Sequence, residues 1–73
     1  MKKYIFKILA VKKGSIGKRQ KFTLTIEAEN FQNAQYKLYD THEHIYIISV
    51  NGIKPDKQYN LILLAKQLDN PIQ

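Results

Sequence analysis

The sequence contains no cysteine, which excludes a disulfide framework and the cysteine spacings of zinc fingers. A chain without disulfides fits a reducing compartment. No run approaches the roughly 20 apolar residues that a membrane-spanning helix needs. The apolar stretch 8–11 is ended by Lys12 and Lys13, so it is too short for the apolar part of a secretory signal. We therefore expect a cytoplasmic protein with no membrane partner.

Catalytic motifs are missing as well. Ser15 and Ser49 lie far in sequence from either histidine, and there is no Walker loop, dinucleotide fingerprint or Gly-x-Ser-x-Gly motif. The six acids show no clustering typical of a catalytic carboxylate pair. We therefore expect a protein that is not an enzyme, has no catalytic residue and uses no cofactor.

Metal ligands are also scarce. His42 and His44 flank Glu43, and a His-x-His pair can bind a transition metal. There is no cysteine and no further histidine to complete a set of ligands. We interpret the pair as two exposed loop histidines near the end of a helix and expect no metal site.

Acidic residues are absent from the first part of the chain. The first acid is Glu27, and residues 1–26 hold eight of the twelve basic side chains. Residues 27–73 hold four bases and six acids, so the two parts carry charges of +8 and −2. This asymmetry suggests a polyanionic partner for the first part. The alternative is a solvated surface that keeps a small protein in solution.

The first strand is predicted over residues 3–11. With 73 residues, the chain is expected to form a single domain, 1–73, around one thin core. One face of the strand is apolar and carries Tyr4, Phe6, Ile8 and Ala10. The other face is mixed and carries Ile5, Lys7, Leu9 and Val11. We expect this second face to be partly covered or to bind something, and it would suit a homodimer.

Two further strands are predicted. Residues 20–28 alternate most clearly, as in a half-buried antiparallel strand. Its inward positions carry Phe22, Leu24, Ile26 and Ala28. Residues 12–19 contain two glycines and break the apolar pattern, which predicts a long hairpin loop. Residues 44–50 are β-branched and aromatic, typical of a central strand, and Asn51-Gly52 indicates a turn after it.

A helix is predicted from Phe31 to about Asp40, with Asn30 as its N-cap. Ala34 and Leu38 follow Phe31 at the spacing of one helical face. We expect one shared core that includes Phe6, Ile8, Leu24, Ile26, Ala34, Leu38 and Ile47.

The tail leaves two alternatives open. A helix over residues 61–68 can start near Pro55 and stop at Pro71, whereas residues 59–64 can instead form a strand. We expect the helix, because leucine and alanine favour it. The predicted fold is α+β: a small antiparallel sheet in β-β-α-β order, one helix packed on the sheet, and a C-terminal helix.

The strongest functional feature is a basic hairpin with five cations in or beside its loop: Lys12, Lys13, Lys18, Arg19 and Lys21. Such a ribbon suits phosphate contacts, which give affinity and register without reading sequence. Arg19 can hold a phosphate bidentately, and the lysines act as point charges. Its alternative is a hairpin that is merely charged and mobile.

Candidate protein contacts are Ile16, at the loop tip, and Tyr36 and Tyr39, on the flanks of the helix. The chain has five tyrosines and three phenylalanines. Exposed aromatic rings can stack on unpaired bases. The alternative is that they pack a small core and leave the hydroxyl at its rim.

Several segments resemble archaeal ribosomal protein LX. They are residues 18–23 (KRQKFT), Ala28-Glu29-Asn30, Ala34, Lys37-Leu38-Tyr39, His42, Ile45 and Ile47. The resemblance covers roughly residues 3–50. It implies a β-β-α-β arrangement that packs against ribosomal RNA, with Lys18, Arg19 and Lys21 facing the RNA. Residues 40–44 are acidic where that family is basic. Small phage proteins of anti-CRISPR type also look similar.

These observations lead to two expectations of function. The first is non-catalytic binding of nucleic acid, RNA rather than DNA and structured RNA in particular, through the basic hairpin. The second is a small phage or mobile-element protein that binds and inhibits a host protein complex that handles nucleic acid. A fold alone does not choose between them.

Overall fold

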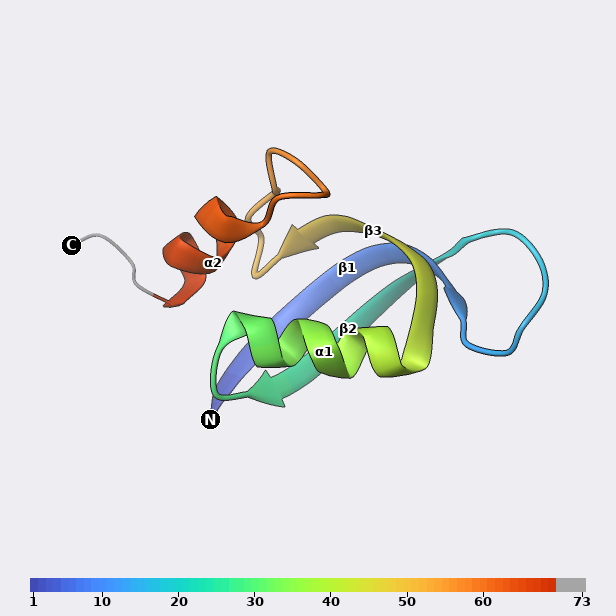
Figure 1. Cartoon of the computed structure of the whole chain (residues 1–73), viewed down its shortest axis with the longest axis horizontal. Coiled ribbons are helices and arrows are strands. Elements are labelled where there is room, and N and C mark those ends of the chain that lie inside the picture. The colour runs from blue at the N-terminus through green and yellow to red at the C-terminus, as the bar shows by residue number, and fades with distance from the viewer. Residues whose placement is uncertain (70–73) are drawn as a thin grey trace.

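The computed structural model describes residues 1–69 and confirms the predicted α+β fold. Three antiparallel strands, β1 (Lys2–Lys12), β2 (Gln20–Ala28) and β3 (His42–Val50), form one sheet in the spatial order β2-β1-β3. Helix α1 (Phe31–Thr41) packs on one face of this sheet, and helix α2 (Ile62–Asp69) follows β3. Figure 1 shows the β1–β2 loop projecting past the end of α1, at the opposite end of the molecule from α2.

Strands β1 and β2 form the predicted hairpin, and its loop occupies residues 13–19. Their pairing runs without interruption from Lys2–Ala28 to Ala10–Gln20. The alternation expected for β1 is confirmed, because its inward residues from Tyr4 to Ala10 are buried. The inward side chains of β2 before Ala28 are only half-buried, and β2 is an edge strand of the sheet.

Strand β3 pairs with β1 in a broken register. Ile48 is an extra residue between two pairs of the ladder, and residues 44–45 stand opposite Ala10 alone. His44 has a φ of 53°, the left-handed conformation that some β-bulges contain. The strand begins at His42, two residues earlier than predicted. These shifts place Tyr46 directly opposite Leu9.

Helix α1 supplies one face of the core. Its N-cap is Asn30, as predicted, and the Asn30 side chain accepts a 2.8 Å hydrogen bond from the backbone N of Asn33. The Phe31 ring lies 5.9 Å from the ring of Phe6 on β1. The buried cluster consists of Tyr4, Phe6, Ile8, Ala10, Ala28, Phe31, Ala34, Leu38, Ile47, Val50 and Leu64. Of the predicted core, Leu24 and Ile26 are only partly buried and pack against this cluster.

The tail forms the predicted helix, so the alternative strand over residues 59–64 is wrong. Helix α2 starts at Ile62, and Pro55 therefore does not begin it. Pro71 lies outside the described residues. Before α2, the side chain of Gln58 exchanges hydrogen bonds of 2.7 and 2.8 Å with the backbone N and O of Ile47, and so occupies the outer edge of β3. Among residues 1–69, no helix has the length and apolar content to cross a bilayer.

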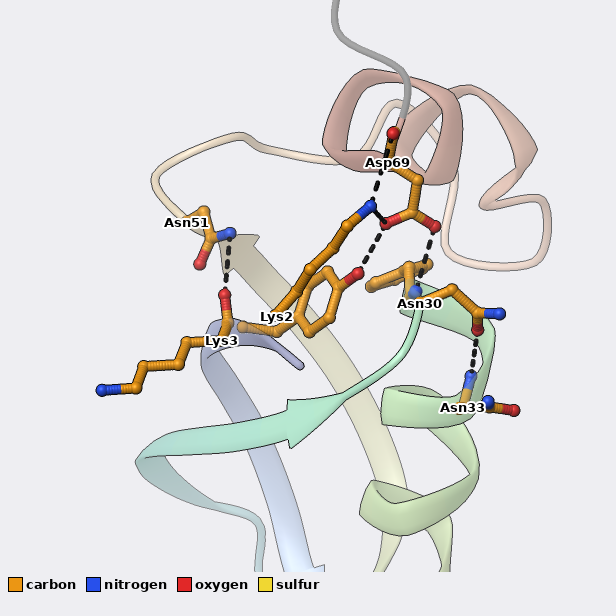
Figure 2. A network of polar contacts seen from close by, with 8 residues as sticks. Lys2, Lys3, Asn30, Asn33, Asn51 and Asp69 are labelled. Atoms are coloured by element: carbon orange, nitrogen blue, oxygen red, sulfur yellow. Dashed lines mark hydrogen bonds and ion pairs between the residues drawn. The ribbon is translucent and has the colours of Figure 1, made fainter.

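Asp69 holds the end of α2 against the rest of the fold (Figure 2). Its carboxylate accepts hydrogen bonds from the Tyr4 hydroxyl, at 2.5 Å, and from the backbone N of Phe31, at 3.0 Å. Burial acts to raise the pKa of Asp69, but these two bonds and the charge of Lys2 outweigh it and hold the pKa below its usual value. The carboxylate thus remains ionised and joins β1, α1 and α2.

Candidate nucleic-acid interface

The structure brings the sequence-predicted cations together on one projecting ribbon. Lys12 ends β1, Lys18 and Arg19 lie in the loop, and Lys21 lies near the start of β2; all four are exposed. The loop begins with a turn in which the backbone N of Ser15 donates to the carbonyl of Lys12. Gly14 lies within this turn and has a φ of 84°. A positive φ favours glycine, which explains why the chain can turn directly after two lysines.

Lys13 differs from the other four cations, because both of its nitrogens bind the end of α1. Its backbone N donates to the carbonyl of Thr41 at 2.9 Å, and its Nζ donates to the carbonyl of Tyr39 at 3.3 Å. A cation at the C-terminus of a helix is favourable, since free carbonyls and the helix dipole meet there. Lys13 therefore anchors the base of the loop to α1 rather than extending its charge outward.

Among residues 1–69, the remaining hairpin cations have no acid within ion-pair distance. Within residues 1–69 the structure contains one ion pair, Lys2–Asp69 at 3.7 Å, at the other end of β1. Lys12, Lys18 and Arg19 are thus exposed and unneutralised in the described part of the chain. A hollow of about 210 Å³ lies at the base of the loop, with Lys12 and Lys18 among its lining residues. This end of the molecule can therefore attract an anionic ligand.

The candidate protein contacts lie on two separate features. Ile16 is fully exposed in the loop and lines the hollow at its base. Tyr36 and Tyr39 are exposed on α1, where their hydroxyls accept hydrogen bonds from Gln32 and Gln35. Tyr39 lines a second, wider cleft of about 560 Å³ between α1 and α2. The structure thus does not bring Ile16 and Tyr39 to one cavity.

The prediction that both histidines lie in a loop is wrong, because His42 and His44 lie in β3. His44 is exposed, as predicted, but the His42 side chain is buried. The rings of His42 and Phe22 are arranged edge to face with their centroids 4.8 Å apart, and the His42 Nδ1 lies 2.7 Å from the Thr41 hydroxyl. Burial lowers the pKa of His42, and the charge of Lys12 lowers it further. Within residues 1–69, no three His, Cys, Asp or Glu side chains gather as metal ligands would.

The sequence indicates the mixed outer face of β1, but it does not indicate which residues of β2 and β3 lie next to that face. Leu9 pairs with Lys21 on β2 and with Tyr46 on β3. Alternation predicts which residues of one strand share a face, but the two bulges in β3 decide which of its residues meet β1. The sequence therefore carries no signal that places Tyr46 beside Leu9, in the same row as Lys21.

Compared with protein families, curated proteins and solved structures, the chain matches none of them. The resemblance to archaeal ribosomal protein LX accordingly stays a prediction. A function for this chain must be inferred from the charge, exposure and shape of its surface.

Proposed function

We propose that the protein is a non-catalytic, cytoplasmic binder of nucleic acid, structured RNA in particular, and that the β1–β2 hairpin is its contact. The observation that carries this proposal is the set of exposed cations Lys12, Lys18 and Arg19, which have no acid within ion-pair distance among residues 1–69. Each phosphate that such a cation neutralises releases condensed counterions, and this release drives binding.

The hairpin cations suit different parts of this task. Arg19 presents a planar fork that can hold two oxygens of one phosphate, while Lys12 and Lys18 act as mobile point charges on neighbouring phosphates. Lys13 fixes the base of the loop on α1, so that the ribbon keeps its direction. Contacts of this kind position a nucleic acid without reading its sequence.

The test is a binding titration of the wild-type chain with a hairpin RNA, duplex DNA and single strands, each at low and at moderate salt. We expect micromolar or tighter binding at low salt and a steep loss of affinity as salt rises. Tighter binding of the RNA hairpin than of duplex DNA would support structured RNA as the ligand. A dissociation constant weaker than micromolar for every ligand, even at low salt, would contradict the proposal.

A second candidate is a protein-binding inhibitor or adaptor of phage or mobile-element type. The observation that favours it is Ile16, an apolar side chain fully exposed in the loop. Such a residue can anchor a protein contact while the surrounding lysines face an acidic patch. The test is a pull-down of host proteins with the wild-type chain and with Ile16→Asp, each after nuclease treatment. A host protein that the wild type retains and Ile16→Asp loses would support this candidate over the first.

A further inference from the structure

Strand β1 lies between β2 and β3, and Lys7 and Leu9 on its outer face each have a paired neighbour on both sides. Lys21, Leu9 and Tyr46 form one row across the sheet. Thr23, Lys7 and Ser49 form the next row. With strands about 4.8 Å apart, the Cα atoms of Lys21 and Tyr46 lie roughly 10 Å apart on the two sides of Leu9.

These two rows and the adjacent Ile5 form a surface that we call the open face. Tyr46 and Ile5 each remain 45% exposed, and Lys7 and Lys21 are exposed. Both helices lie on the other side of the sheet. Helix α1 packs there, and α2 joins the same core through the buried Leu64. The helices therefore leave this face uncovered. Ser49 is buried within it and Leu9 is partly exposed, while a tyrosine ring and aliphatic side chains lie between lysines.

Charge indicates what occupies this surface. Its charged residues are Lys7 and Lys21, whereas acids lie only in the flanking rows, Glu27 opposite Lys3 and Glu43 opposite Val11. A second copy of the chain packed face to face would bring lysines against lysines, which opposes such a dimer. A polyanion is attracted instead. The exposed tyrosine adds a flat ring on which a base can stack.

Stacking on this tyrosine requires a base that is unpaired. In a duplex, each base is already stacked between its neighbours and its flat surface is not accessible. In a single strand or loop, bases can turn out and stack on an aromatic side chain while basic residues contact the backbone. Lys21 connects the open face to the hairpin, because it lies two residues after Arg19. A strand held by the hairpin can thus continue onto the open face.

We propose that the open face binds an unpaired stretch of the nucleic acid that the hairpin holds. Tyr46 stacks on a base, Leu9 and Ile5 extend the apolar surface beside it, and Lys7 and Lys21 contact flanking phosphates. This inference rests on the proposed function and adds to it a class of ligand, single-stranded segments, and a second contact surface.

The test compares Tyr46→Ala with Tyr46→Phe, which keeps the ring, and with Tyr36→Ala as a matched control. Tyr36 is also exposed, but it lies on α1, on the other side of the sheet. Affinities are measured for single-stranded RNA, the same strand as DNA, and the RNA duplex, after urea unfolding has verified that each variant folds.

We expect Tyr46→Ala to weaken the binding of both single strands about 5- to 150-fold, the range for loss of one stacked base, since every base has a flat face. Affinity for the duplex should change less than about 2-fold. Tyr46→Phe and Tyr36→Ala should bind single strands as the wild type does.

Other outcomes would overturn the inference in distinguishable ways. If Tyr46→Ala binds single strands normally while loss of the hairpin cations weakens binding, the open face is not a contact and the proposed function stands. If the wild type binds no nucleic acid, both fail. If Tyr46→Ala instead converts a dimer into a monomer in sedimentation, with single-strand affinity unchanged, a second copy occupies the face.

Discussion

The hydroxyl of Tyr4 on β1 donates a 2.5 Å hydrogen bond to the carboxylate of Asp69, the last residue of α2 and 65 positions later in the chain. Tyr4 is buried, so this carboxylate is the acceptor that offsets the loss of water around its hydroxyl. The same carboxylate accepts from the first amide of α1. One side chain thus connects β1, α1 and α2, which are far apart in the sequence.

Replacing Asp69 by alanine should therefore destabilise the protein. We expect Asp69→Ala to lower the free energy of unfolding by about 1–3 kcal/mol, because the Tyr4 hydroxyl would remain buried without a partner. Asp56→Ala removes the same charge from an exposed position and should cost less than about 0.5 kcal/mol. Urea unfolding measures both, and equal losses would show that the contact to Tyr4 is not the cause.

The buried His42 predicts a pH dependence of stability. Because its pKa is lowered in the folded state, the unfolded chain takes up the proton first as the pH falls. The contribution of the neutral ring is thus complete above its ordinary pKa of 6.5 and is lost as the pH falls through the lowered value. Stability should therefore decline as the pH falls below about 7 toward this lowered pKa.

In the variant His42→Gln, the free energy of unfolding should decline less steeply as the pH falls, whatever its value at neutral pH. His44→Asn is the control, because His44 is exposed and asparagine tolerates its positive φ. Denaturant unfolding at a series of pH values gives the slopes. A wild-type slope in His42→Gln would mean that another group titrates.

The different burial of two leucines predicts that replacing each by alanine lowers the free energy of unfolding by a different amount. Leu38 is fully buried at the centre of the core, so Leu38→Ala should cost about 2–5 kcal/mol. Leu24 lies at the core's edge on β2 and is partly exposed, so Leu24→Ala should cost about 1–2 kcal/mol. Thermal or urea unfolding can rank the two. A larger loss at Leu24 would contradict the packing of α1 against the sheet.

Much of the fold could be predicted from the sequence, because apolar spacing encodes which side of each element is buried. The alternation from Tyr4 to Ala10 correctly predicted the inward face of β1. The helical spacing of Phe31, Ala34 and Leu38 correctly predicted the inward face of α1. The hairpin loop follows from two glycines between two alternating strands. These signals are local, so they can be read without tertiary contacts.

The parts that could not be predicted depend on polar contacts between distant residues. Gln58 completes the edge of β3 through its contact with Ile47, yet nothing local distinguishes it from any surface glutamine. His42 follows a polar helix end, which suggests an exposed side chain, but its ring is buried and packs edge to face with Phe22. The hairpin cations can be predicted because they lie close together in the sequence. The open face cannot, because it depends on the pairing of β3 with β1, which the bulges in β3 determine.

The proposed contact is tested most directly by two matched triple variants. The hairpin variant replaces three exposed cations by alanine: Lys12, Lys18 and Arg19. The control replaces three exposed lysines outside the hairpin: Lys54, Lys57 and Lys66. Both lose the same charge, and Lys13 is kept because it anchors the loop.

The measurement is the affinity of each variant for structured RNA over a salt series. The hairpin variant should bind all sequences more weakly by a similar factor, and the slope of log K against log salt should flatten by up to about 2–3, one step for each lost phosphate contact. The control should keep nearly the wild-type slope. If the hairpin variant binds as the wild type does, or if the control loses as much, the hairpin is not the contact.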